Sequence, residues 1–227
     1  MLASLLAAFQ GGCGGSSHKS ASTPASSSPS TTPSTPSTSS SAPGAGAAAP
    51  PSSAVVVLAA RLLRGSDLIG FTPHGSVTAV TRPDRWVEAS EPGAPADARK
   101  QHVARLQRLG FTGAAREQLE ADAGGGAEAI SVVERFGAPS AARAELQGQL
   151  AQLQAQGGFT SFAVPGIPGA RGLATTPGGA VSGVNVAFAK GADTYLVGIG
   201  APAGRSPSPS RADLIAAAKR LYARVQP

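Results

Sequence analysis

The sequence predicts an α+β fold in which an antiparallel sheet is packed by about three helices, forming a single domain after a disordered N-terminal tract. Apart from His18 and Lys19, residues 14–53 are all Ser, Thr, Pro, Ala or Gly, so they have almost no apolar surface to offset the entropy of ordering. Residues 54–227 are long enough to bury one core. Along them the hydrophobic spacing gives the order helix, two strands, helix, three strands, helix.

The first segments of the domain are short. Residues 54–64 suit either a short helix or an irregular lead-in, and we expect the packed core to begin at about residue 66. Strand character on either side of the Pro-His-Gly sequence at 73–75 predicts a small hairpin or two edge strands over residues 68–80. Residues 82–84 indicate another turn, and Trp86 after it is expected to anchor the core.

The middle of the chain alternates between helix and hairpin signals. Residues 95–109 predict a helix, with Val103 and Leu106 on its apolar stripe and Gly110 placed to end it in a left-handed conformation. Residues 111–121 and 128–136 predict a hairpin whose second strand is well buried. A second helix is expected from Ser140, as its N-cap, to about residue 156.

The C-terminal part predicts a strand at 159–164, a loop at 165–179 and a hairpin of residues 184–190 and 194–199, joined by Gly191-Ala192-Asp193. Ser210 and Asp213 form a capping box at the start of the last helix. Its apolar residues recur at helical spacing, so this helix must pack on the sheet: Leu214, Ala218, Leu221 and Val225.

The Pro- and Gly-rich segment at 162–179 has a single charge, at Arg171, and two interpretations remain open for it. It is a ligand-contacting loop, or it is an edge strand with bulges. If a pocket lies between this segment and the hairpin that follows, Arg171, Lys190 and Tyr195 are the predicted polar contacts with a ligand.

The charge distribution disfavours a nucleic-acid-binding protein. The formal net charge is +6, but residues 54–160 hold 11 basic and 11 acidic side chains, and the excess lies after residue 160. Basic residues late in the last helix suit the helix dipole and a solvated face. Aromatic residues make up only 4% of the chain, so the basic segments lack stacking rings. Binding of a basic face to anionic lipid or to a wall polymer remains an open alternative.

No catalytic or metal-binding pattern is present in the sequence. The single cysteine cannot pair within the chain or supply a Cys/His zinc site, and no G-x-S-x-G or H-E-x-x-H motif occurs. His74 is expected to serve a turn and His102 a surface or packing role. The acidic pairs, such as Glu88 with Glu91, are expected to be surface charges. We therefore expect no enzyme activity and no cofactor, with an envelope hydrolase of unrecognised active site as the alternative.

Residues 1–13 resemble a bacterial lipoprotein signal, because a short apolar run ends in Gly11, Gly12 and Cys13. The resemblance implies that the thiol of Cys13 is lipidated and that residues 14–53 form a tether, which would span roughly 35 Å as a coil. The apolar run is shorter than the about 20 residues that a transmembrane helix needs. The alternative is a free cysteine in a disordered tail.

Four blocks of the domain carry a further resemblance: Gly110-Phe111 after the first helix, residues 131–146, the hairpin at 184–198 and the helix at 214–225. They look like actinobacterial secreted lipoproteins of unknown function that are similar to the extracellular sensor domains of bacterial serine/threonine kinases. The resemblance implies a noncatalytic, extracytoplasmic binding or sensing module, anchored at the cell surface through Cys13. Its implied partners are the membrane and a small molecule, lipid or envelope polymer.

Overall fold

The computed structural model describes residues 53–124, 126–176, 181–202 and 210–227. The predicted signal segment, Cys13 and nearly all of the predicted tether lie outside the described residues. None of the helices in these ranges is both long enough and apolar enough to span a membrane.

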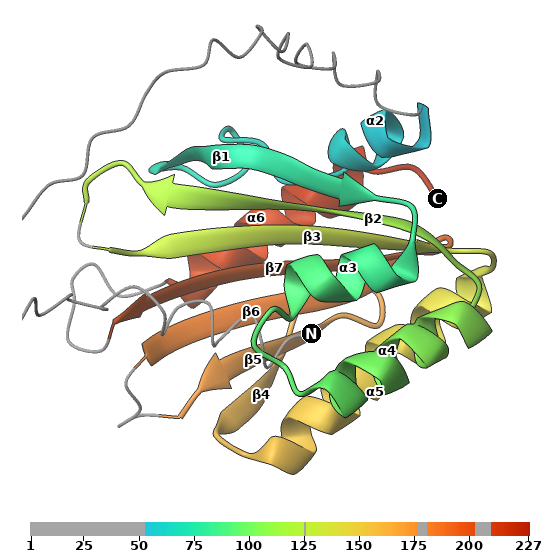
Figure 1. The fold of residues 1–227 in the computed structure, drawn as a ribbon. Coiled ribbons are helices and arrows are strands. Elements are labelled where there is room, and N and C mark those ends of the chain that lie inside the picture. Colours follow the sequence, from blue (N-terminus) through green and yellow to red (C-terminus); the bar gives the residue numbers. More distant parts are fainter. Residues whose placement is uncertain (1–52, 125, 177–180, 203–209) are drawn as a thin grey trace, which may run out of the picture.

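The described chain forms one antiparallel sheet of seven strands in the order β1-β2-β3-β7-β6-β5-β4 (Figure 1). The strands are β1 (Phe71–Val80), β2 (Phe111–Ala121), β3 (Glu128–Phe136), β4 (Phe159–Ala163), β5 (Arg171–Thr175), β6 (Val181–Lys190) and β7 (Asp193–Pro202). Both predicted hairpins, β2–β3 and β6–β7, are confirmed, and β3 pairs with β7 at the centre of the sheet. The α+β class is therefore confirmed.

The described residues hold five helices rather than about three, and they cover both faces of the sheet (Figure 1). These are α2 (Ser53–Ala59), α3 (Pro83–Ser90), α4 (Ala96–Arg108), α5 (Pro139–Gln156) and α6 (Arg211–Arg224). Residues of α2 and α6 share one core layer with Val133 and Val197 of the sheet. Residues of α3, α4 and α5 share the other with Val132 and Leu196. Neighbouring strand residues enter opposite layers because side chains alternate along a strand.

The predicted break at residues 73–75 is not a chain reversal. Residues 71–80 form one continuous edge strand, β1, whose register with β2 shifts between His74 and Thr78. Gly75 has a φ of +77° at this point, so the glycine that predicted a turn lies in a bulge of the strand. Pro73 is tolerated because an edge strand leaves some of its N–H groups unpaired.

Two helix starts differ from the sequence prediction for the same reason. The turn expected at residues 82–84 is the start of α3, and the cap expected at Ser140 is wrong because α5 begins at Pro139. Proline is favoured in the first helical turn, where its missing N–H costs nothing. Trp86 of α3 is fully buried, as predicted. Helix α4 matches the predicted helix to within a residue, and Gly110 has a φ of +67°.

The predicted loop at 165–179 is partly a strand. Residues 171–175 form β5, which lies inside the sheet between β4 and β6, so β4 is the edge strand. The irregular segment between β4 and β5 is therefore only residues 164–170. It is fastened to the sheet by three buried side chains, those of Val164, Ile167 and Ala170.

The core begins before residue 66, contrary to the expectation. Leu58, Leu62 and Leu63 are each at most 2% exposed and belong to the layer beneath α6.

Asp193, expected in a turn, is a buried first residue of β7. Its carboxylate accepts two hydrogen bonds from Arg135, at 2.7 and 3.0 Å, and pairs with Arg61. The segment before β1 is thus an integral part of the domain.

Candidate functional site

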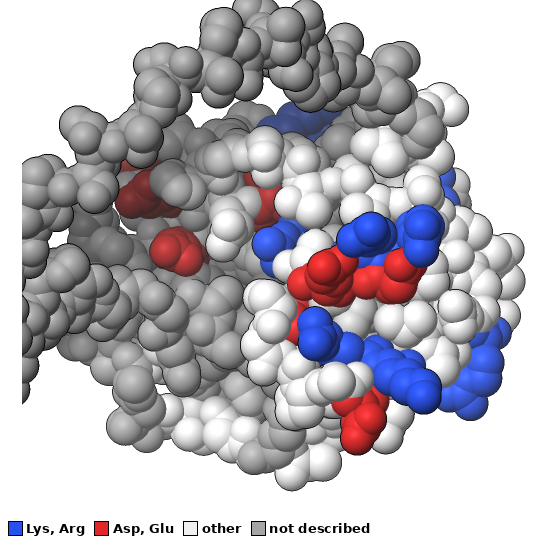
Figure 2. All heavy atoms as spheres, viewed as in Figure 1, with Lys and Arg blue, Asp and Glu red and all other residues white. Residues whose placement is uncertain are grey.

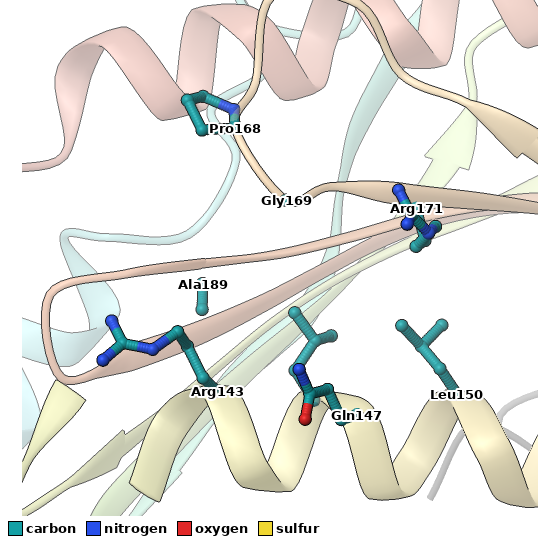
Figure 3. Close-up of a pocket in the computed structure, with 8 residues that line it drawn as sticks. Arg143, Gln147, Leu150, Pro168, Gly169, Arg171 and Ala189 are labelled. Carbon is teal, nitrogen blue, oxygen red and sulfur yellow. The ribbon is translucent and has the colours of Figure 1, made fainter. Parts of the chain in front are cut away.

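A cavity of about 250 Å³ lies between α5, the segment 164–170 and the sheet; we call it the α5 pocket (Figure 3). It is at the place where the sequence suggested a pocket, between the Pro- and Gly-rich segment and the β6–β7 hairpin. The lining residues come from four elements: Arg143, Leu146, Gln147 and Leu150 of α5, Pro168 and Gly169, Arg171 of β5 and Ala189 of β6.

Small and turn-forming residues keep the α5 pocket open. Gly169 adopts a φ of +71°, which turns the segment around the end of the pocket and leaves no side chain to fill it. Ala189 gives the wall on β6 only a methyl group. Leu146 and Leu150 lie one helical turn apart, so they form a continuous apolar floor on one flank of α5.

Two guanidinium groups border this apolar floor. Arg143 and Arg171 are both exposed, and neither takes part in an ion pair among the described residues. Arg171 donates one hydrogen bond, at 3.3 Å, to the carbonyl oxygen of the neighbouring Ala170. Both cations are therefore available to a negatively charged group in the pocket.

The three predicted ligand contacts do not share one pocket. Arg171 lines the α5 pocket, whereas Lys190 and Tyr195 lie on the opposite face of the sheet, beneath α6. Lys190 Nζ donates to the carbonyl oxygen of Tyr222 at 2.7 Å and lies 4.3 Å from the centre of its ring. The second cation at the pocket is instead Arg143 of α5. The sequence spacing alone could not show that a residue of this helix lies beside β5.

Tyr195 is part of the buried cluster around Asp193. Its hydroxyl donates to the Asp193 carboxylate at 3.1 Å, and its ring stacks on that of Phe188. Burial raises the pKa of the Tyr195 hydroxyl, and the neighbouring Asp193 charge raises it further. The hydroxyl also accepts a hydrogen bond from Arg61 at 3.2 Å, which joins the sheet to the segment before β1. With an exposed fraction of 1%, Tyr195 has no surface for a ligand.

A second polar cluster, the Glu134 cluster, is buried between α5 and the sheet. The Glu134 carboxylate accepts hydrogen bonds from Trp86 Nε1 at 2.7 Å, Gln149 Nε2 at 3.1 Å and Thr194 Oγ1 at 3.2 Å. Gln149 also donates to Glu145 at 2.8 Å, so its amide bridges the two carboxylates. Burial raises the pKa of Glu134, and the nearby charge of Glu145 raises it further.

His102, which is buried and so serves packing as one of its two expected roles, lies beside this cluster. Its Nδ1 lies 3.1 Å from Glu91 Oε1, and its Nε2 lies 3.9 Å from Glu145 Oε1. Glu91 is only 6% exposed, so its expected role as a surface charge is wrong. His74, expected in a turn, is an exposed β1 residue whose Nδ1 lies 3.1 Å from Glu120 Oε2. Among the described residues, the ion-pair partners of both histidines are carboxylates.

Comparisons with known proteins give one weak match. No family model matches the chain, and no curated protein matches it. Among solved structures, the extracellular domain of PknH from Mycobacterium tuberculosis is similar, with 14% identity and a TM-score of 0.48 over 74% of this chain and 95% of that one. A similarity at this level says nothing about ligand or activity.

The α5 pocket is therefore the candidate site on its own geometry. It combines an apolar floor with two exposed cations that have no acidic partner among the described residues. This arrangement can hold a small molecule that carries both a negative charge and an apolar portion. The buried Asp193 and Glu134 clusters do not line the pocket and hold other elements together.

Proposed function

We propose that this protein is a noncatalytic ligand-binding or sensing module of the cell envelope, held at the membrane by a lipid on Cys13. The observation that supports binding is the α5 pocket with Arg143 and Arg171 at its border. The support for the location is the apolar run that ends in Gly11, Gly12 and Cys13 at the start of the chain.

The lining indicates an amphipathic anion as the ligand. Leu146, Leu150 and Ala189 offer apolar surface, and the guanidinium groups offer planar pairs of donors that match a carboxylate or phosphate. The volume of about 250 Å³ lies just below the usual range for ligand pockets, about 300–1,000 Å³, so the ligand is small. A medium-chain carboxylate has this combination of head and tail.

Calorimetric titration of the full-length chain with octanoate tests the binding proposal. We expect Arg171→Gln and Arg143→Gln each to weaken binding by about tenfold, because each removes one charge-assisted contact. The effect should shrink as salt is added. Arg85→Gln is the control, since Arg85 is an exposed residue of α3 paired with Glu88. Equal affinities in all four proteins would reject the α5 pocket as the binding site.

Metabolic labelling with a palmitate analogue tests the membrane anchor. The wild-type chain, expressed in a bacterium that processes lipoproteins, should be labelled and should sediment with the membrane. Cys13→Ser removes the thiol that carries the lipid, so that variant should be neither labelled nor sedimented. Labelling that persists in Cys13→Ser would contradict the anchor without affecting the pocket.

A further inference from the structure

A second cavity, of about 360 Å³, opens on the other flank of α5, between this helix and α4; we call it the α4 groove. Its lining residues are Glu91, Ala98, Gln101, His102, Arg105 and Arg108 together with Gln152 of α5. Gln152 lies about half a turn around α5 from the residues that line the α5 pocket. The two cavities are therefore separate.

The α4 groove is lined mainly by polar side chains. The lining residues of α4 recur at a spacing of three or four, so they form one face of that helix, and this face is polar except for Ala98. Arg105 Nη2 donates to Glu145 Oε1 at 2.9 Å and connects the two helices. Figure 2 shows basic side chains gathered along α4 on the same side of the molecule as α3.

The groove offers more donors than acceptors. Arg108 forms no ion pair among the described residues, and its exposed side chain ends in a planar pair of donors. The exposed amides of Gln101 and Gln152 add donors and acceptors suited to hydroxyl groups. The acidic lining residue, Glu91, is buried and faces His102. Because Arg105 is paired with Glu145, Arg108 supplies the lining cation that has no acidic partner among the described residues.

We propose that the α4 groove binds a small polar oxyanion, a carboxylate or phosphate whose other groups are hydroxyls. Arg108 holds the charged group, and Gln101 and Gln152 bind hydroxyls beside it. Ala98 is the one apolar side chain among the lining residues, too small to hold a hydrocarbon tail, which separates this ligand class from that of the α5 pocket. The proposal rests on the α4 groove alone and does not depend on binding at the α5 pocket.

The test is titration of the full-length chain with glucuronate and, separately, with inorganic phosphate, followed by nuclear magnetic resonance of the backbone amides. In the wild-type chain we expect saturable shifts in α4 and near Gln152. Arg108→Gln should weaken binding of either anion by about tenfold. Gln152→Ala should weaken glucuronate by at least threefold and leave phosphate nearly unchanged, because phosphate lacks the additional hydroxyls.

Lys100→Gln is the matched control. Lys100 is an exposed cation of α4 that does not line the groove, so its removal changes the net charge equally without touching the lining. Thermal unfolding of each variant establishes that it is folded. Arg108-dependent binding of glucuronate alone identifies a sugar acid, and of both anions a general oxyanion site. Absence of binding of both anions, or equal weakening by Arg108→Gln and Lys100→Gln, would overturn the proposal. The octanoate titration with Arg171→Gln fails or succeeds independently.

Discussion

Glu134 is a buried acidic residue whose carboxylate is surrounded by hydrogen-bond donors. Its carboxylate is only 2% exposed and lies close to a second buried carboxylate, that of Glu145. Burying two such groups is unfavourable unless donors surround them. Trp86, Gln149 and Thr194 supply those donors to Glu134 from three different elements. The hydrogen bonds to this one carboxyl group therefore join α3, α5 and β7.

The stability of the protein should depend on pH through Glu134. Its pKa is raised in the folded chain by burial and by Glu145, so the folded state retains this proton to a higher pH than the unfolded state does. The free energy of unfolding should therefore fall as pH rises from the usual glutamate range through the raised pKa. Each unit of pKa difference corresponds to about 1.4 kcal/mol. The charge of Glu145 raises the pKa of Glu134, whereas the interaction with His102 lowers it.

Urea unfolding of the wild type and of Glu134→Gln, across the acidic to neutral range, measures this dependence. The variant cannot ionise, so its stability relative to wild type should increase with pH. Glu128→Gln, at the partly exposed start of the same strand, is the control and should follow the wild type. Parallel curves for wild type and Glu134→Gln would contradict the assignment.

Part of the Glu134 cluster and of the α5 pocket could be predicted from the sequence. Ile130, Val132, Glu134 and Phe136 occupy alternate positions of one strand, so the phase of β3 already placed Glu134 on a core face. Because side chains alternate along β6, Lys190 and Ala189 likewise had to lie on opposite faces of the sheet. Which face the segment 164–170 would approach depends on α5 and β5, and no local pattern contains that information. This is why Arg171 was found and Arg143 was missed.

Among the secondary-structure elements, β4 and β5 depend on a contact that involves a glycine. A Cβ atom at Gly172 would lie 2.0 Å from the ring of Phe162, so the ring occupies the space that a side chain would need. The guanidinium carbon of Arg211 in α6 lies 4.3 Å from the centre of the same ring. Gly172 thus allows β4 to approach both its neighbour strand and the start of α6.

Gly172→Ala should destabilise the protein by about 1–3 kcal/mol, because the methyl group displaces the Phe162 ring. Urea unfolding gives the loss, and Gly93→Ala is the control, since a Cβ there would contact nothing within 4 Å. If the clash is the cause, Gly172→Ala should cost less in a Phe162→Ala background than in the wild type. An equal cost in both backgrounds would assign the loss to the backbone of β5.

The elements that the sequence failed to predict share a physical reason. Helix α3 has eight residues and starts with proline, a residue that begins turns and helices alike. Strand β5 has five residues, one of them Gly172, and is defined by its partners on both sides. The longer elements carry their own signals; Ser210, for example, accepts a hydrogen bond from the Asp213 amide, as the capping box predicted.

At the scale of the whole molecule, the segment before β1 holds the domain together. Leu58, Leu62 and Leu63 enter the core, and Arg224 of α6 donates to the carbonyl oxygens of Ala60 and Leu62 at 3.0 and 2.7 Å. The fold class and the two hairpins followed from local patterns. The pairing of β3 with β7, which unites the two halves of the sheet, is a contact between distant segments that only the folded chain reveals.

A chain that begins at residue 53 should therefore unfold cooperatively, and one that begins at residue 66 should not retain that stability. Removing three buried leucines forfeits about 1.5–3 kcal/mol for each. Their sum is comparable with the 5–15 kcal/mol of a typical domain. Thermal unfolding followed by circular dichroism compares the two chains. Equal midpoints would show that the segment 53–65 adds nothing to stability.

Arg61 also donates to the carbonyl oxygen of Gln226 at 2.8 Å, so the first and last described segments meet at one point. That point lies with α2 and α6, on the face of the sheet opposite α3, α4 and α5 (Figure 1). A fusion partner or support joined at residue 53 or at residue 227 would therefore attach on the side of α2 and α6. The α4 groove, lined by α4 and α5, would then lie on the opposite face of the sheet from the attachment.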